Sequence, residues 1–196
     1  MAKPLDLMSE RRRRDDSERA RRSEALIDSA TRAFARNGFE AATTRQIAAE
    51  AGCSEGLIHR YFGGKAGLLD AVLGDVADSV VGSLALEAGD HGEDAVQHAM
   101  AAALRAVDGQ RDGVRLLFLR ALTDSGTAQL LSGLRERYVS QLVTVIAPDG
   151  DDRSSSDRAQ VVADLMVGLT LLRVVAGGST DDGAAARAAR ILTAPH

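Results

Sequence analysis

The 196-residue sequence has little of what disulfide-bonded, sheet-rich or membrane-spanning proteins need. Cys53 is the single cysteine, so no disulfide can form within the chain. Aromatic residues make up only 3%, tryptophan is absent, and alternating runs of β-branched residues are scarce. The most apolar stretch, residues 165–178, is too short to span a bilayer and contains Arg173. No secretory signal is visible at the N-terminus, so we expect a cytoplasmic protein that does not enter the membrane.

Helix-forming residues and an uneven charge distribution dominate the composition. Hydrophobic residues account for 45% and charged residues for 27%, and alanine and leucine are abundant, which favours an all-α globular protein. Residues 1–65 carry 13 Lys or Arg and 10 Asp or Glu, whereas the remainder carries 11 and 18. The first third therefore has a net charge of +3 in a chain of net charge −4. This asymmetry indicates an N-terminal module that faces an anionic partner.

Hydrophobic periodicity and loop-forming residues predict about nine helices and no strand. An apolar stripe from Leu26 to Phe34 lies on one face of the first helix, and Gly38 ends that helix. The predicted helices span residues 17–37, 43–51, 54–62, 65–86, 93–108, 112–124, 127–146, 157–177 and 183–193. Residues 1–16, which include "RRRRDD", are expected to be a disordered basic tail, with a phosphate-contacting arm as the alternative. We place a small N-terminal domain at residues 17–66 and a larger helical domain at 67–196.

The two short helices at 43–51 and 54–62 have clear start and stop signals. The motif "TTRQ" fits a capping box, in which Thr43 accepts from the Gln46 amide and Gln46 reaches back. Gly52 ends the first of these helices, and Ser54 is expected to cap the second. Two short helices joined by such a turn form a helix-turn-helix, whose second helix enters the major groove of DNA.

The predicted helix 54–62 has one apolar face and one face suited to a groove. Ile58 and Phe62 share the side expected to be buried. Gly56 and Arg60 lie on the opposite side, where a missing side chain lets the backbone approach a partner closely. Gly56 is a poor choice for stability alone, since Gly costs about 1 kcal/mol relative to Ala. Lys65 opposes the macrodipole at the start of the next helix, but there it would also favour a bound phosphate.

The run "GFEAATTRQIAAEAGCSEGLIHRYFGGKAGLLDAVL" resembles the DNA-binding domain of the TetR family of bacterial transcriptional regulators. The likeness covers about residues 20–75 and implies that DNA phosphates are held by Thr43, Thr44, Ser54, Tyr61 and Lys65. It also implies that the groove is faced by Arg45, Glu55, Gly56, Leu57, His59 and Arg60. Three positions depart from the family pattern. His59 stands where the family often has a tyrosine, Gly63-Gly64 replaces a commoner Pro-Ser or similar pair, and Ala66 replaces a frequent acidic residue.

Side-chain chemistry supports base contacts at three of these positions. Arg45 suits guanine O6 and N7, Glu55 suits the amino group of cytosine, and Leu57 suits the methyl group of thymine. Helix capping, solvated surface or partial burial, without any DNA role, remain the alternatives for Thr43, Arg45, Ser54, His59, Arg60 and Tyr61.

In this family the C-terminal helices bind an effector and form the dimer, so the resemblance implies the same for residues 67–196. The candidate ligand-binding residues, each of which also suits a plain core, are His98, Met100, Phe118, Leu122, Tyr138 and Met166. The helix predicted at 157–177 is apolar on two sides, and it is expected to pair with the "AAARAARIL" helix in a two-fold, four-helix interface. The expected interface residues are Val162, Met166, Val174, Ala188 and Ile191. A monomer that uses both sides internally is the alternative.

Together these features predict a homodimeric transcriptional repressor that a small-molecule effector releases from double-stranded operator DNA. The long helix that begins at Lys65 is expected to move as a lever between the domains. An all-helical enzyme is one alternative, although the sequence shows no nucleophile–base pair and no Gly-rich phosphate loop. A helical interaction protein is another alternative, and activation instead of repression stays open. We expect no cofactor and no metal, because the four histidines are scattered.

Overall fold

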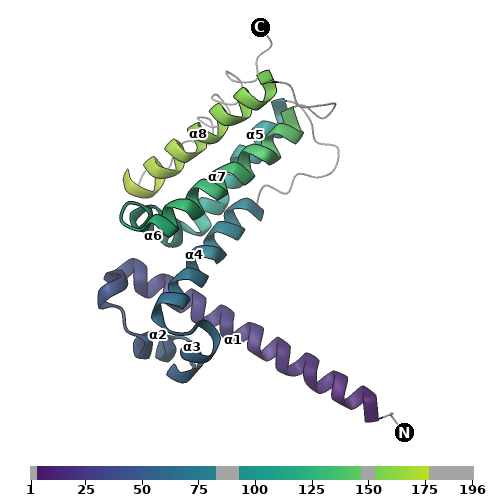
Figure 1. Cartoon of the computed structure of the whole chain (residues 1–196), viewed down its shortest axis with the longest axis vertical. Coiled ribbons are helices and arrows are strands. Elements are labelled where there is room, and N and C mark those ends of the chain that lie inside the picture. Colours follow the sequence, from purple (N-terminus) through teal and green to yellow (C-terminus); the bar gives the residue numbers. More distant parts are fainter. Residues whose placement is uncertain (1–3, 83–92, 147–152, 177–196) are drawn as a thin grey trace. The chain divides into compact units, whose positions relative to one another are not determined.

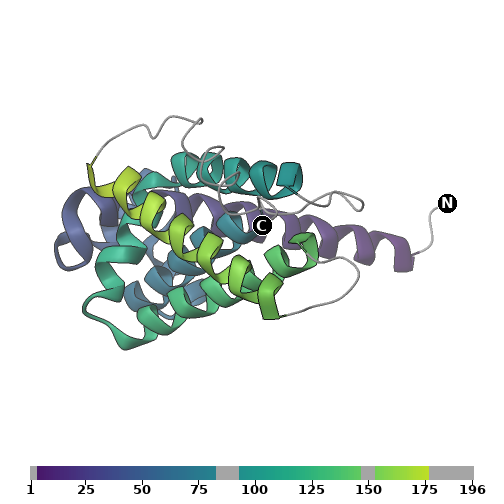
Figure 2. The same ribbon diagram turned by 90° about the horizontal axis from the view of Figure 1, so that it is seen from above.

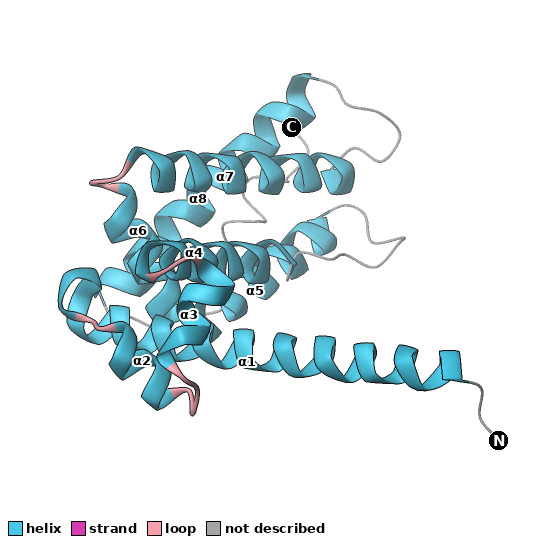
Figure 3. Cartoon of the chain, turned by 60° about the horizontal axis from the view of Figure 1, so that its bottom comes forward, coloured by secondary structure: helices cyan, strands magenta, loops and turns pink. Residues whose placement is uncertain are grey.

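The computed structural model is helical in the residues that it describes, which are 4–82, 93–146 and 153–176 (Figure 1). No strand occurs within these ranges (Figure 3), so the prediction of an all-α fold is confirmed. The described helices are α1 (Pro4–Ala41), α2 (Thr44–Glu50), α3 (Glu55–Phe62), α4 (Lys65–Gly82), α5 (Glu93–Gly109), α6 (Arg111–Ala121), α7 (Ser125–Ile146) and α8 (Arg153–Ala176). The helix predicted at residues 183–193 lies outside the described ranges, as does the end of the helix predicted at 65–86.

The chain divides into two compact units, Met1–Val72 and Leu73–His196, and the division falls inside α4. The domain boundary predicted between residues 66 and 67 also falls inside this helix. The N-terminal unit contains α1, α2, α3 and the first turns of α4, and the C-terminal unit contains the rest of α4 with α5 to α8. Each unit has its own set of buried apolar side chains.

Helix α1 begins much earlier than the sequence predicted. Residues 4–16, expected to be disordered, form the first turns of this helix, whose N-terminal part extends beyond α2 and α3 (Figure 1). The physical reason is that Pro4 suits a first helical turn and that neither glycine nor proline follows before Gly38. Arg22 also pairs with Glu18 one turn earlier, as suits an exposed helix. Gly38, at φ 75° and ψ 165°, interrupts the helix where the sequence predicted its end.

The core of the N-terminal unit is built from one face of each of its helices. The stripe predicted on α1 is confirmed, since Leu26 and Phe34 are 0% and 1% exposed. The other buried apolar side chains of this unit include Ala30, Ala33, Ile47, Ala48, Ile58, Leu68, Leu69 and Val72. Burial of each large side chain contributes about 2 kcal/mol, so this small unit depends on α1 to cover α2 and α3.

The C-terminal unit is a bundle in which α5, α7 and α8 pack around a shared apolar cluster (Figure 2). One cluster joins these three helices through side chains such as Met100, Leu142 and Val162. A second cluster joins Val76 of α4 and Val174 of α8 to the α5–α6 region. Both clusters are apolar, so the helices are held together by burial.

The face of α8 that we expected at a dimer interface is instead part of the chain's own core. Val162, Met166 and Val174 are 0%, 5% and 6% exposed, because this side of α8 packs on α5, α7 and α4. The opposite side leaves Val161 and Leu172 half exposed. The prediction is therefore wrong for Val162, Met166 and Val174, because the chain's own core already covers them. The other two interface residues predicted, Ala188 and Ile191, lie outside the described residues.

Candidate functional site

Helices α2 and α3 are joined by a tight turn at residues 51–54. Backbone hydrogen bonds close this turn, from Cys53 N to Ala48 O at 2.8 Å and from Gly52 N to Ala49 O at 3.1 Å. Gly52 takes a φ of +64°, a conformation that side chains disfavour. The two helices thus form the helix-turn-helix that the sequence predicted.

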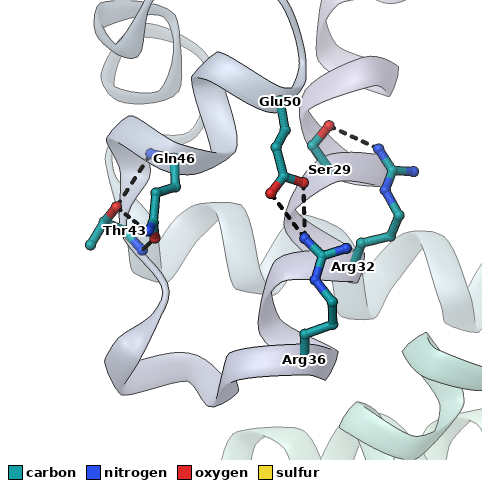
Figure 4. A network of polar contacts seen from close by, with 6 residues as sticks. All are labelled: Ser29, Arg32, Arg36, Thr43, Gln46 and Glu50. Atoms are coloured by element: carbon teal, nitrogen blue, oxygen red, sulfur yellow. Dashed lines mark hydrogen bonds and ion pairs between the residues drawn. The ribbon is translucent and has the colours of Figure 1, made fainter.

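The capping box at the start of α2 is confirmed (Figure 4). The Thr43 Oγ1 accepts a hydrogen bond from the Gln46 amide at 3.2 Å, and the Gln46 side chain accepts from the Thr43 amide at 3.4 Å. At the other end of α2, Arg36 of α1 donates to both carboxylate oxygens of Glu50, at 2.9 and 3.0 Å. These contacts set where α2 begins and fasten its end to α1.

The start of α3 is held differently from the prediction. Ser54 occupies the N-cap position with an extended backbone, but its side chain makes no capping hydrogen bond. Instead, the Thr44 hydroxyl donates to Glu55 Oε1 at 2.6 Å, which joins the first residues of α2 and α3. Two predicted DNA contacts therefore lie together, and the Glu55 carboxylate is already oriented in the free protein.

The outward face of α3 matches the predicted recognition surface. Ile58 is 0% exposed, whereas Glu55, Gly56, His59 and Arg60 are exposed and Leu57 is partly exposed. A Cβ atom placed at Gly56 would meet no atom within 4 Å, so nothing inside the unit requires a glycine there. Because Ala would favour the helix by about 1 kcal/mol, neither helix stability nor packing among the described residues accounts for this glycine.

The aromatic end of α3 is less buried than predicted. Phe62, expected in the core with Ile58, is only partly buried, because it lies in the last turn of the helix. The rings of Tyr61 and Phe62 meet edge to face at 6.2 Å, and the Arg19 guanidinium lies 5.3 Å from the Tyr61 ring centre. Tyr61 is thus partly buried, and a basic residue of α1 lies beside it.

Lys65 has an internal partner that its sequence position does not indicate. Its Nζ donates to the backbone carbonyl of Glu40 at 3.1 Å and lies 4.6 Å from the centre of the Phe39 ring. Both partners belong to the last turn of α1, where free carbonyls favour a cation. The charge that is unfavourable for α4 is therefore favourable for α1, and Lys65 links the two helices.

Two features of this surface were missed by the sequence prediction. A groove of about 510 Å³ runs between α1 and the turn before α3, and its lining includes Arg21, Arg22, Ser54 and Leu57. Helical spacing could have predicted that Arg21 and Arg22 are exposed on α1, but not that they lie beside Ser54 and Leu57. The second is Gly67, whose Cβ would lie 1.9 Å from the carbonyl oxygen of Phe62. A glycine in a first helical turn was the only signal.

The six candidate ligand-binding residues do not form one site. Phe118, Tyr138 and Met166 line a single cavity of about 90 Å³ within the C-terminal unit. Met100 is fully buried in the core between α5, α7 and α8 and does not line that cavity. His98 is exposed and Leu122 is 82% exposed, because each lies on the outer side of its segment. The prediction is therefore wrong for these last three positions.

Among the described residues, no three His, Cys, Asp or Glu side chains are grouped so that they could hold a metal ion. None of the described helices has the length and apolar composition that crossing a bilayer requires.

Thr43 caps its helix with a side-chain hydrogen bond and Ser54 does not, and this difference can be tested by measuring the free energy of unfolding. We expect Thr43→Ala to lower the free energy of unfolding by about 1 kcal/mol, since it removes a side-chain cap. Ser54→Ala is expected to change it by less than about 0.5 kcal/mol, because Ser54 makes no such bond. Urea denaturation followed by circular dichroism measures both, and equal losses would show that Ser54 also caps its helix.

The fold and the exposed face of α3 define an all-α protein with an N-terminal helix-turn-helix unit. Residues 26–72 match the family model described as bacterial regulatory proteins, tetR family. A curated relative, the HTH-type transcriptional regulator HbdR of Aromatoleum sp. (strain CIB), is 35% identical over 99 residues. That alignment covers 50% of this chain but only 43% of the relative. The N-terminal part of the chain is therefore similar to the DNA-binding domain of tetR-family transcriptional regulators, and the chain spans less than half the length of the curated relative.

Solved structures share this fold over most of the chain. A tetR-family transcriptional regulator from Streptomyces coelicolor is similar with a TM-score of 0.72 and 20% identity, over 87% of this chain and 78% of that one. A TetR-like transcriptional regulator from Rhodococcus sp. RHA1 has a TM-score of 0.68 and 22% identity, over 88% and 93% of the two chains. The similarity extends beyond the helix-turn-helix, so the C-terminal bundle shares the fold of these structures.

Proposed function

We propose that this chain is a homodimeric transcriptional repressor that binds operator DNA and is released by a small-molecule effector. The observation that carries the proposal is the outward face of α3. There Gly56, which no contact among the described residues requires, lies among exposed polar side chains, on the side of the helix opposite the buried Ile58. A helix entering the major groove needs a place where its backbone can come close and polar groups beside it that read bases. Arg60 and His59 supply such groups next to Gly56.

The phosphate contacts are proposed to come from both sides of this helix. Thr43, Thr44 and Ser54 present hydroxyl or backbone donors around the starts of α2 and α3, where helix dipoles favour an anion. Arg21 and Arg22 add positive charge along the groove beside Ser54. Lys65 remains a candidate, but binding a phosphate would have to compete with its contact to Glu40.

A homodimer is proposed because α8 leaves apolar side chains uncovered. Val161, Leu171 and Leu172 are 49%, 43% and 59% exposed, although α8 already contributes its other side to the core. A two-fold pairing through this exposed side would cover it. The two copies of α3 would then read half-sites about one turn of DNA, 34–36 Å, or a multiple of it apart.

Release by an effector is proposed to act through α4. Val76 and Val80 of this helix line the cavity of the C-terminal unit, and Lys65 begins the same helix. A ligand that favours one position of α4 would shift the protein between states with different DNA affinity. Comparing the α3-to-α3 distance in the dimer with and without effector tests this, and an unchanged distance would count against it.

The direct test is binding of the protein to the DNA upstream of its own gene, measured by fluorescence anisotropy. We expect specific binding with a Kd on the order of 10⁻⁸ M, and much weaker binding to unrelated DNA. An enzyme or a protein-interaction module with this fold would show no such preference. Reporter transcription from the bound promoter, with and without the protein, separates repression from activation.

Two arginines are expected to differ in how they affect DNA binding. Arg21→Ala should weaken binding to all sequences by a similar factor and lower the salt slope by about one, because Arg21 is assigned to phosphates. Arg45→Ala should reduce the binding free energy by about 1–3 kcal/mol on DNA that has the base preferred at the Arg45 contact. On DNA in which that base is replaced, the substitution should have no such effect. The exposed Arg105 of α5 provides the control, and Arg105→Ala should change neither quantity. Identical behaviour of Arg21→Ala and Arg45→Ala would contradict the two assignments.

A further inference from the structure

The cavity of the C-terminal unit, which is partly open to the surface, is almost entirely apolar. Its volume is about 90 Å³, and it is walled by aliphatic side chains of α4 to α8 with Phe118 and Met166. Polar groups enter the lining at only three places, Arg135, Tyr138 and Thr170. Most of what the cavity could hold would therefore be in contact with hydrocarbon.

Tyr138 is the polar group of this lining that needs explanation. The residue is 8% exposed, and its hydroxyl is buried without a hydrogen-bond partner among the residues that the structure describes. A buried hydroxyl is usually bonded, since leaving it unsatisfied is unfavourable. Burial raises the pKa of the phenol, so the group stays protonated and able to donate at neutral pH.

The cavity offers no uncompensated charge to a ligand. Arg135 donates from Nε to Asp164 Oδ1 at 2.6 Å, and this hydrogen bond lowers the pKa of the Asp164 carboxyl. The pair is thus ionised and already balanced near neutral pH. An ionised ligand would lose its hydration in an apolar cavity without gaining a free counter-ion, which is strongly unfavourable.

We infer that this cavity binds a small, uncharged molecule with an apolar body and one hydrogen-bond acceptor oxygen, and that the acceptor meets the Tyr138 hydroxyl. The volume of about 90 Å³ is smaller than the cavity of about 150 Å³ that holds benzene, so a single six-membered ring is the largest body that fits, with part of it in the open side of the cavity. A ketone, an ester or an ether of this size has the required chemistry. This inference names the class of effector and rests on the proposed function for its regulatory meaning.

The test compares two probes of nearly the same shape, cyclohexanone and methylenecyclohexane, which differ in the acceptor oxygen. Dissociation constants are measured on the full chain by ligand-observed NMR. In Tyr138→Phe, we expect the dissociation constant of cyclohexanone to rise about tenfold relative to that of methylenecyclohexane. The variant should fold, since it removes a hydroxyl that bonds to no described residue and keeps the ring. Arg105→Ala, at an exposed residue of α5 that does not line the cavity, should leave the ratio of the two constants unchanged.

A second variant locates the binding. Ala163 of α8 lines the cavity and is 1% exposed, so Ala163→Val should weaken both probes by at least about fivefold. Cyclohexanecarboxylate, which is charged, should not bind. An unchanged probe ratio in Tyr138→Phe, tight binding of the carboxylate, or no binding of either probe would overturn the inference. DNA binding is measured on the same samples, so failure of the proposed function would appear there without affecting the probe results.

Discussion

Gly67→Ala is expected to destabilise the N-terminal unit by about 3 kcal/mol. The alanine Cβ would lie 1.9 Å from the Phe62 carbonyl oxygen and 3.0 Å from its carbonyl carbon. These are backbone atoms at the end of α3, and Gly63 in the left-handed conformation follows them directly, so no side chain can simply rotate away. The joint between α3 and α4 would have to shift, which moves Ile58 and Leu68 in the core.

Differential scanning calorimetry measures this effect as a fall in Tm of the N-terminal transition, by about 4–8 °C for each kcal/mol in a unit of this size. The matched control is Gly74→Ala in the same helix, where an added Cβ meets nothing within 4 Å. That control should gain up to about 1 kcal/mol, because alanine favours the helix. A Gly67→Ala protein as stable as its parent would show that α3 and α4 do not approach as closely as described.

Gly56→Leu is expected to abolish specific DNA binding while leaving the fold intact. Open space surrounds this position, so the leucine adds no internal clash and improves the helix by somewhat under 1 kcal/mol. Against a duplex, however, the side chain would hold α3 away from the bases. Loss of two good base contacts, at about 1–3 kcal/mol each, corresponds to at least about a thirtyfold loss in affinity.

Anisotropy titrations and a melting curve on the same protein measure both quantities. Gly56→Ala should show an intermediate loss, because the methyl group is small. Gly109→Leu, at an exposed glycine of α5 in the other unit, should retain parental DNA affinity. Full affinity of Gly56→Leu would mean that this face of α3 does not contact DNA, and the candidate site would then have to be placed elsewhere.

Secondary structure near the site could be predicted because its signals act over short distances. The capping box joins Thr43 to a residue three positions later, and Gly38 changes the backbone at its own position. Such effects depend on neighbouring residues, which the sequence lists in order. The prediction failed at residues 4–16 because charged, helix-forming sequence suits both a disordered tail and a solvated helix.

Partners that are distant in the chain could not be predicted in the same way. Lys65 bonds to the carbonyl of Glu40, and Arg21 lies along a groove with Ser54. Neither pairing has a spacing that a helical or strand pattern could reveal. The same reason explains why only some candidate ligand residues line the cavity, since His98 and Leu122 are exposed while Tyr138 is buried.

The amino-acid order alone was enough to establish the helices, the helix-turn-helix and the bare, polar side of α3, because each depends on residues within about one turn of one another. Three-dimensional packing settled the rest. It selected which apolar side of α8 faces the core, left the Tyr138 hydroxyl without a partner in the described part of the chain and brought Gly67 against Phe62. These outcomes depend on which helices meet, and burial is shared among side chains that lie far apart in the chain.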